Sequence, residues 1–157
     1  MSISTLYSQF TDLRATTTAL PQDLAPTWDV ELNIRLRGPY SLAGFIGKST
    51  DNVYENHGGG FRIDIPGFFF IGGNVLREAA RSQRKYPVST SAFGFLMQQT
   101  KNDEETGESS RFTGSIMGMS MDVFLFNPYS FLTVQASFFN TQGHAFFSYS
   151  YGVGFEY

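Results

Sequence analysis

The sequence predicts a mainly β protein: a small barrel or sandwich of about six to eight antiparallel strands, flanked by one or two helices. Apolar and polar residues alternate in several stretches, and clusters of Gly, Pro and Asn separate those stretches. The length of 157 residues fits one domain. We therefore expect an N-terminal helical or extended arm over 1–26 and a single β-rich domain over 27–157, with a helix at 74–86.

The arm is predicted from the apolar residues of the first twenty positions, which recur at spacings of three and four: Ile3, Leu6, Phe10 and Leu13. This spacing favours a short helix, and Pro21 and Pro26 then favour an extended connector. The N-terminus has no positive charge ahead of an apolar core, so we expect no secretory signal. No apolar run reaches about 18 residues, so we expect no transmembrane helix.

Residues 27–37 carry the clearest strand pattern. The even positions are apolar: Trp28, Val30, Leu32, Ile34 and Leu36. The odd positions are polar and form a candidate channel-facing or interface face: Asp29, Glu31, Asn33 and Arg35. A period of two predicts one dry and one wet face, and we expect the apolar face to be buried in the protein. A return strand is expected at 40–46.

The middle of the chain is expected to hold a loop over 47–60, which contains the triplet Gly58-Gly59-Gly60. A short strand at 61–65 and a buried apolar run at 68–71 follow. Asn74 is a good helix cap and Pro87 a helix stop, which bounds the helix at 74–86. One face of this helix is basic and is a candidate contact between subunits: Arg77, Arg81, Arg84 and Lys85.

The remainder predicts strands at 91–100, 112–126, 131–139 and 145–157, separated by turns. The loop at 101–110 is acidic and is a second candidate contact between subunits: Asp103, Glu104, Glu105 and Glu108. Alternate methionines at 117, 119 and 121 are expected to fill the core. The last strand alternates aromatic and small residues and ends at Tyr157.

The composition excludes several kinds of chemistry. The chain has no Cys and only two His, so we expect no disulfide, metal site or cofactor. The segment GFIGKST at 44–50 resembles part of a phosphate-binding loop, but Leu42 stands where the first Gly is required. No catalytic constellation is present, so we expect a structural or binding protein rather than an enzyme. Aromatics at 17% and charges at 16% leave surplus apolar surface, which we expect further copies of the chain to bury.

The order of these pieces resembles the tail-tube proteins of contractile-tailed bacteriophages and related injection systems. The resemblance rests on Pro26-Thr27-Trp28 at the start of the first strong strand and on Phe155-Glu156-Tyr157 at the end of the last. It implies a structural virion protein, assembled in the host cytoplasm, whose hexameric rings stack into a tube. Implied partners are other copies, sheath or baseplate proteins and DNA as transient, non-specific cargo, with no membrane.

Two other interpretations stay open. The alternating last strand with its terminal Tyr157 is also typical of an outer-membrane β-barrel, although the absent signal and the basic helix argue against it. A soluble small-ligand-binding β-barrel with an aromatic-lined cavity is the third. The tail tube is the favoured prediction.

Overall fold

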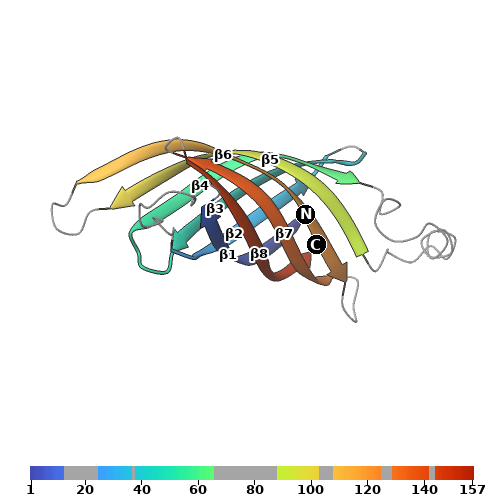
Figure 1. Ribbon diagram of the computed structural model, residues 1–157. Coiled ribbons are helices and arrows are strands. Elements are labelled where there is room, and N and C mark those ends of the chain that lie inside the picture. The colour runs from blue at the N-terminus through green and yellow to red at the C-terminus, as the bar shows by residue number, and fades with distance from the viewer. Residues whose placement is uncertain (13–24, 37, 66–87, 103–107, 125–128, 142–143) are drawn as a thin grey trace, which may run out of the picture.

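The structure, a computed structural model, describes residues 1–12, 25–36, 38–65, 88–102, 108–124, 129–141 and 144–157. These residues form one closed antiparallel barrel in which each strand pairs with its sequence neighbours (Figure 1). The strands are β1 Ser2–Asp12, β2 Thr27–Arg35, β3 Tyr40–Ser49, β4 Tyr54–Ile65, β5 Val88–Asn102, β6 Ser109–Phe124, β7 Ser130–Thr141 and β8 His144–Glu156. The β-barrel part of the sequence prediction is confirmed.

Closure is made by the first and last strands, since β1 pairs with β8 from Ser2↔Glu156 to Asp12↔Phe146. Following paired residues from Ser2 around all eight strands leads back to Asp12, ten residues further along β1. That stagger requires the strands to tilt by about 41° from the barrel axis. A sheet closed in this way leaves no free edge in the barrel wall.

The expected helix in the first twenty residues is wrong over Ser2–Asp12, which form β1. Leu6 and Phe10 point into the barrel, whereas Ile3 points outward. The three-and-four spacing of apolar residues therefore does not mark one face. Pairing with β2 on one side and β8 on the other satisfies the backbone of this segment and overrides the local pattern. Residues 2–12 thus belong to the barrel itself.

The loop expected over 47–60 is also largely wrong, because β3 continues to Ser49 and β4 begins at Tyr54. The glycine triplet lies inside β4 and pairs with both neighbouring strands. A Cβ at Gly60 would stand 2.0 Å from the carbonyl oxygen of Gly94 on β5. Glycine at this position therefore permits a close approach of backbones rather than a loop.

Several sequence expectations lie outside the described residues. They are the buried run 68–71, the helix 74–86 with Arg77, Arg81, Arg84 and Lys85, and the acidic residues Asp103, Glu104 and Glu105. Within the described ranges every regular element is a strand, so a flanking helix is absent from that part of the chain. The same ranges contain no helix long and apolar enough to cross a membrane.

Candidate functional site: the outer wall and the lumen

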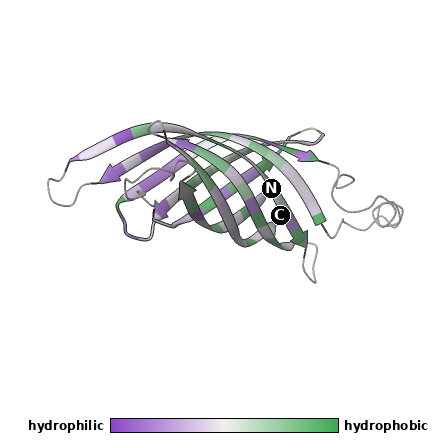
Figure 2. Cartoon of the chain, viewed as in Figure 1, coloured by the Kyte–Doolittle hydropathy of each residue, from purple (hydrophilic) through white to green (hydrophobic). Residues whose placement is uncertain are grey.

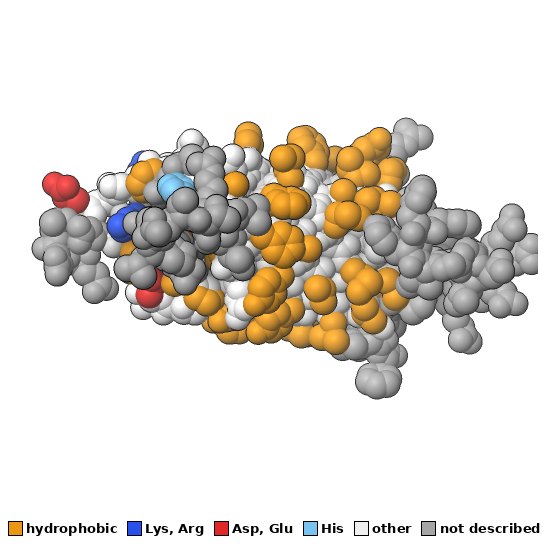
Figure 3. Space-filling model, in the orientation of Figure 1, with side chains coloured by type: hydrophobic (Ala, Val, Ile, Leu, Met, Phe, Trp, Pro, Cys, Tyr) orange, Lys and Arg blue, Asp and Glu red, His pale blue; other side chains and the backbone are white. Residues whose placement is uncertain are grey.

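The outer wall of the barrel is covered by apolar side chains. All eight strands contribute exposed members: Ile3, Trp28, Val30, Leu32, Ile34, Tyr40, Leu42, Ile46, Phe61, Ile63, Leu96, Met117, Met119, Met121, Leu132, Val134, Phe138, Tyr149, Tyr151, Val153 and Phe155. Trp28 is 56% exposed and Leu96 is 76% exposed. Figure 3 shows hydrophobic side chains gathered on the middle and the right-hand part of the face turned to the viewer.

Two sequence expectations are corrected by this wall. The even positions from Trp28 to Ile34 were expected to be buried, but they face outward, and Asp29, Glu31 and Asn33 are the buried ones. The methionine stripe was expected to fill the core, but Met117, Met119 and Met121 are exposed. Alternation of apolar and polar residues shows that a strand has two different faces, but it does not show which face points into the barrel. On β2 and β6 the usual assumption that apolar residues face the interior therefore fails, although other strands do place apolar side chains such as Phe93 and Phe139 inside.

The apolar wall forms a belt of limited height. Along β2 it runs from Trp28 to Ile34 and continues to Leu36, which spans about 20 Å along the axis at a tilt of about 41°. Toward the β3–β4 and β5–β6 hairpins the exposed residues become polar or charged, and Lys48 and Glu55 form an ion pair at 3.5 Å. Figure 2 shows this hydrophilic end, and the belt lies between it and the end that carries both termini.

Aromatic side chains mark both edges of the belt. On the side of the hairpins, the ring of Tyr7 lies 4.9 Å from Trp28 and 5.5 Å from Tyr151. On the side of the termini, exposed tyrosines lie at the ends of strands or next to them: Tyr40, Tyr129 and Tyr157. An apolar band flanked by two aromatic girdles is the outer surface typical of transmembrane β-barrels.

The lumen on the side of the termini is filled by a polar network centred on Glu31 and Arg62. These two side chains form a buried ion pair, and Glu31 is 1% exposed. Arg62 Nη1 donates to Ser120 Oγ at 3.0 Å, and Gln135 Nε2 donates to Glu31 Oε2 at 3.1 Å. Asn33 Nδ2 donates to Glu31 Oε1 at 2.9 Å. These partners come from β2, β4, β6 and β7. Ser91 of β5 adds a hydrogen bond to Ser120 at 2.7 Å, so the network joins five strands across the interior.

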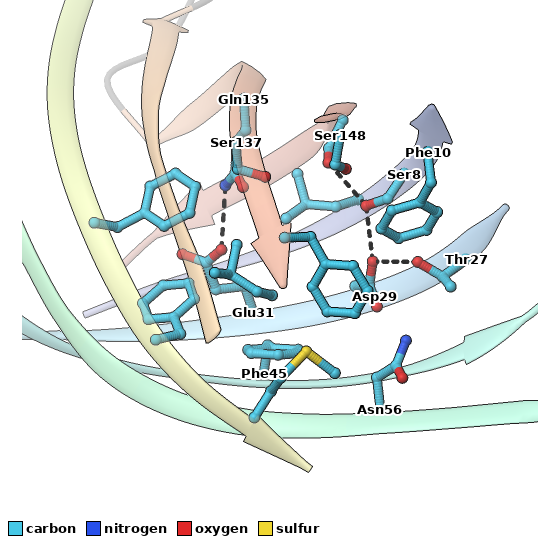
Figure 4. A pocket seen from close by; sticks show the side chains of 17 residues that line it. Ser8, Phe10, Thr27, Asp29, Glu31, Phe45, Asn56, Gln135, Ser137 and Ser148 are labelled. Atoms are coloured by element: carbon cyan, nitrogen blue, oxygen red, sulfur yellow. Dashed lines mark hydrogen bonds between the residues drawn. The ribbon is translucent and has the colours of Figure 1, made fainter. Parts of the chain in front are cut away.

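The lumen nearer the hairpins is filled by aromatic rings and Met97. Phe93 and Phe95 stack at 5.0 Å, and Phe139 contacts Phe10 and Phe146 at 5.5 and 5.9 Å. The cavities among the described residues include one of about 50 Å³ among these rings (Figure 4) and one of about 80 Å³ at the end with the termini. Both are far smaller than the roughly 300–1,000 Å³ of drug-sized ligand pockets. Neither of these two cavities has room for a drug-sized ligand.

The structure separates the residues proposed as sites from sequence. Asp29, Glu31 and Asn33 lie together inside the barrel. Arg35 lies at the lumen mouth, where its Nη2 is 2.6 Å from Asp64 Oδ2, and Glu108 is exposed beside β6. Sequence reasoning missed Arg62, which pairs with Glu31 and also lies 3.9 Å from Asp122. Its only sequence signal was a charge between the apolar residues Phe61 and Ile63.

Solved structures with the same fold are outer-membrane barrels. The N-terminal β-barrel domain of Pseudomonas aeruginosa OprF is similar with a TM-score of 0.63 and 12% identity, covering 98% of this chain and 96% of that one. Neisserial surface protein A is similar with a TM-score of 0.55 and 10% identity, and the match covers 99% of this chain and 95% of that one. The Yersinia pestis outer-membrane protein Ail in a phospholipid bilayer nanodisc is similar with a TM-score of 0.55 and 10% identity, and the match covers 99% of this chain and 97% of that one. No protein-family model and no curated protein matches the sequence.

These findings overturn the tail-tube interpretation. The similar structures are outer-membrane barrels, not tail-tube proteins, and so contradict a virion location, stacked hexameric rings, sheath or baseplate partners and the absence of a membrane. The barrel also closes within one chain, which leaves the wall no strand edge to share with a neighbouring subunit. The aromatic residues at the start and end of the β-rich region do not distinguish the two classes of protein. Tail-tube subunits and membrane barrels both have alternating strands whose outer apolar face is covered by other molecules, either further subunits or lipid.

Proposed function

We propose that this chain is an outer-membrane protein that spans the lipid bilayer as a single eight-stranded barrel. The observation that carries the proposal is the apolar belt, which continues around a barrel without a free edge. In water, exposing so many large apolar side chains would be unfavourable by about 25 cal/mol for each Å². Acyl chains of lipid remove that cost, and closure satisfies every strand backbone inside the bilayer. The similarity in fold to OprF, NspA and Ail supports the same assignment.

The proposed role is that of a closed, non-enzymatic barrel rather than an open pore. The lumen is filled by aromatic side chains in the half nearer the hairpins and by the Glu31–Arg62 network in the half nearer the termini. Eight strands give an interior just wide enough for side chains to fill, whereas aqueous pores need more strands. The chain would therefore act through surfaces outside the bilayer, on a rigid barrel that anchors them.

The polar end of the barrel is the part that we propose projects from the membrane. β5 and β6 are the longest strands, with 15 and 16 residues, and their paired ends carry Lys101 and Arg111. Lys48 and Glu55 face solvent at the neighbouring hairpin. Charged side chains at these positions avoid the hydrocarbon, where they would be unfavourable by about 2–4 kcal/mol each at the midplane.

The single tryptophan provides a direct test. Trp28 is the only Trp of the chain and is exposed on the outer wall. When the purified protein is folded into phosphatidylcholine vesicles, we expect brominated acyl chains to quench its fluorescence strongly. We also expect insolubility without detergent and a folded form that migrates differently on gels before and after heating. A detergent-free soluble monomer with unquenched Trp28 would contradict the proposal.

A matched control moves the indole inside the barrel. In the double variant Trp28→Phe with Phe95→Trp, the fluorophore occupies a lumen position that is 5% exposed. Brominated lipid should then quench little, while the heat-dependent gel shift shows that the barrel has formed. Equal quenching of the two proteins would show that the inside and the outside have been assigned incorrectly.

A further inference from the structure

We propose that a short free edge of β6, at residues 109–113, binds an extended acidic segment of another protein as an added strand. The edge lies beyond the rim of the barrel, on the β5–β6 hairpin. Within the apolar belt every strand pairs on both sides, but β6 continues past the tip of the β7–β8 hairpin (Figure 1). The proposal rests on this strand register and not on the membrane assignment.

The register shows how far β6 projects. Its pairing with β5 begins at Asn102↔Ser109, whereas its pairing with β7 begins only at Gly114↔Thr141. On the other side of the hairpin, β4 pairs with β5 almost to its last residue. Within the described part of the chain, residues 109–113 therefore have a strand on one side only. The open side is about 17 Å long, since a strand rises about 3.4 Å per residue.

The backbone groups on the open side belong to alternate residues. The N–H of Asn102 donates to the carbonyl oxygen of Val53 at 2.8 Å, so the backbone of Asn102 faces the β4 side. Backbone groups alternate in direction along a strand. The backbone of Ser109, which pairs with Asn102, therefore faces away from β5, as do those of Arg111 and Thr113. Each of the three offers an N–H donor and a C=O acceptor to an added antiparallel strand.

The side chains of the edge select an acidic partner. Arg111 is exposed at the centre of the five residues, and the hydroxyl residues Ser109 and Thr113 flank it on the same face. None of the ion pairs among the described residues involves Arg111. Phe112 is half-buried on the opposite face. A strand with a carboxylate opposite Arg111 and an apolar side chain opposite Phe112 would complement both faces.

The same charge disfavours pairing between two copies of the chain. If the edges of two copies paired antiparallel over all five residues, Arg111 would stand directly opposite its own counterpart. Like charges in that position destabilise a strand pair. A charged residue here also limits aggregation through the edge, as charges do on other exposed strands. The edge is therefore suited to a foreign acidic segment rather than to self-association.

The test uses two backbone-cyclised β-hairpin peptides, which are already extended and so lose little conformational freedom on binding. One has an outer strand that reads Thr-Val-Glu-Val-Thr, and the other has Lys in place of Glu. NMR follows hydrogen exchange of single backbone amides of the barrel in zwitterionic detergent. With the Glu hairpin at about ten times its Kd, exchange should slow about tenfold at Ser109, Arg111 and Thr113, because these amides then exchange only from the free edge. Ser110 and Phe112, whose amides face β5, should change little.

Two variants assign the binding to this edge. Arg111→Glu reverses the charge at its centre, so the Lys hairpin should then bind about fivefold more tightly than the Glu hairpin. Thr113→Pro removes an N–H that faces the partner and no hydrogen bond to β5, so it should abolish the protection while the heat-dependent gel shift persists. As the control, Lys48→Glu reverses an exposed charge at the neighbouring hairpin and should leave the preference for the Glu hairpin unchanged.

The wild-type comparison of the two hairpins needs no variant to fold. Equal protection by both hairpins, or no protection at millimolar peptide, would overturn the proposal and leave Arg111 as a guard against aggregation. Protection that spreads equally to Ser110 and Phe112 would show general stiffening of the hairpin and would also overturn it. Protection that grows with protein concentration in the absence of peptide would overturn it in favour of a second copy as the occupant. Failure of lipid quenching at Trp28 would refute the membrane assignment without affecting this result, so the two proposals can fail separately.

Discussion

The outer wall and the lumen are built by the same eight strands from alternate residues, yet their chemistry differs: the wall carries an apolar belt, whereas the lumen combines a polar network with aromatic rings. On β2, Val30 and Leu32 face outward, whereas Asp29 and Glu31 are buried. In a water-soluble domain the two sets would exchange places. The difference shows that the solvent around the barrel decides which set is stable on which side, while the backbone pattern is the same in both cases.

The two regions are also held by different forces. The lumen depends on specific partners, since the Glu31–Arg62 pair needs Ser120, Gln135 and Asn33 in fixed positions. The wall has only general requirements: apolar side chains in the belt and amphipathic rings at its edges. Substitutions in the lumen should therefore depend strongly on the identity of the residue, and substitutions on the wall on its polarity and depth.

The largest expected effect comes from removing one charge of the lumen. Arg62→Met leaves Glu31 buried without its counter-charge and should lower the free energy of unfolding by about 3–5 kcal/mol. Urea unfolding of the barrel in detergent measures the change. In the double variant with Glu31→Leu the unpaired Glu31 charge is gone as well, so much of the loss should be recovered, apart from the share due to Asp122, which lies 3.9 Å from Arg62. If the double variant is as unstable as Arg62→Met, the ion pair does not explain the stability of this region.

A charge on the wall should have the next largest effect, and only within the belt. Val134 is 50% exposed near the middle of β7, and Val134→Arg should destabilise the vesicle-embedded barrel by about 2–4 kcal/mol. Asn140 lies on the same strand and the same face, six positions closer to the polar end. Asn140→Arg should cost less than about 1 kcal/mol. Equal losses in the two variants would show that no lipid belt exists.

The strands could be predicted from sequence because apolar and polar residues alternate along a strand in the same way whether the apolar face points inward or outward. The strand at 27–37 and the strands after residue 88 are found close to their expected positions. Local patterns could not reveal that β1 is a strand, since its stability comes from β2 and β8, which are distant in sequence. They also could not identify the lumen site. Arg62 pairs with Glu31, which lies 31 positions earlier in the sequence, and only the register of β2, β3 and β4 brings the two side chains together.

The smallest expected effect tests the two sides with the same added methyl group. Gly60 faces the lumen, and its Cβ would stand 2.0 Å from the carbonyl oxygen of Gly94. Gly94 faces outward, and its Cβ would meet only Met117 Cγ at 4.0 Å. Gly60→Ala should therefore destabilise the barrel by about 1–3 kcal/mol through overpacking. Gly94→Ala should stabilise it by about 0.5–1 kcal/mol, because it reduces the freedom of the unfolded chain.

Urea unfolding under identical conditions compares the two alanine variants. A similar loss in both would mean that the wall at β5 is as tightly packed as the lumen, which contradicts the open surroundings of Gly94. A loss confined to Gly60→Ala would locate close packing on the inner side of β4. The wall would then be the side on which side-chain volume is free to vary, because the lipid chains of the proposed bilayer adapt to its shape, whereas the neighbouring backbone inside the barrel does not.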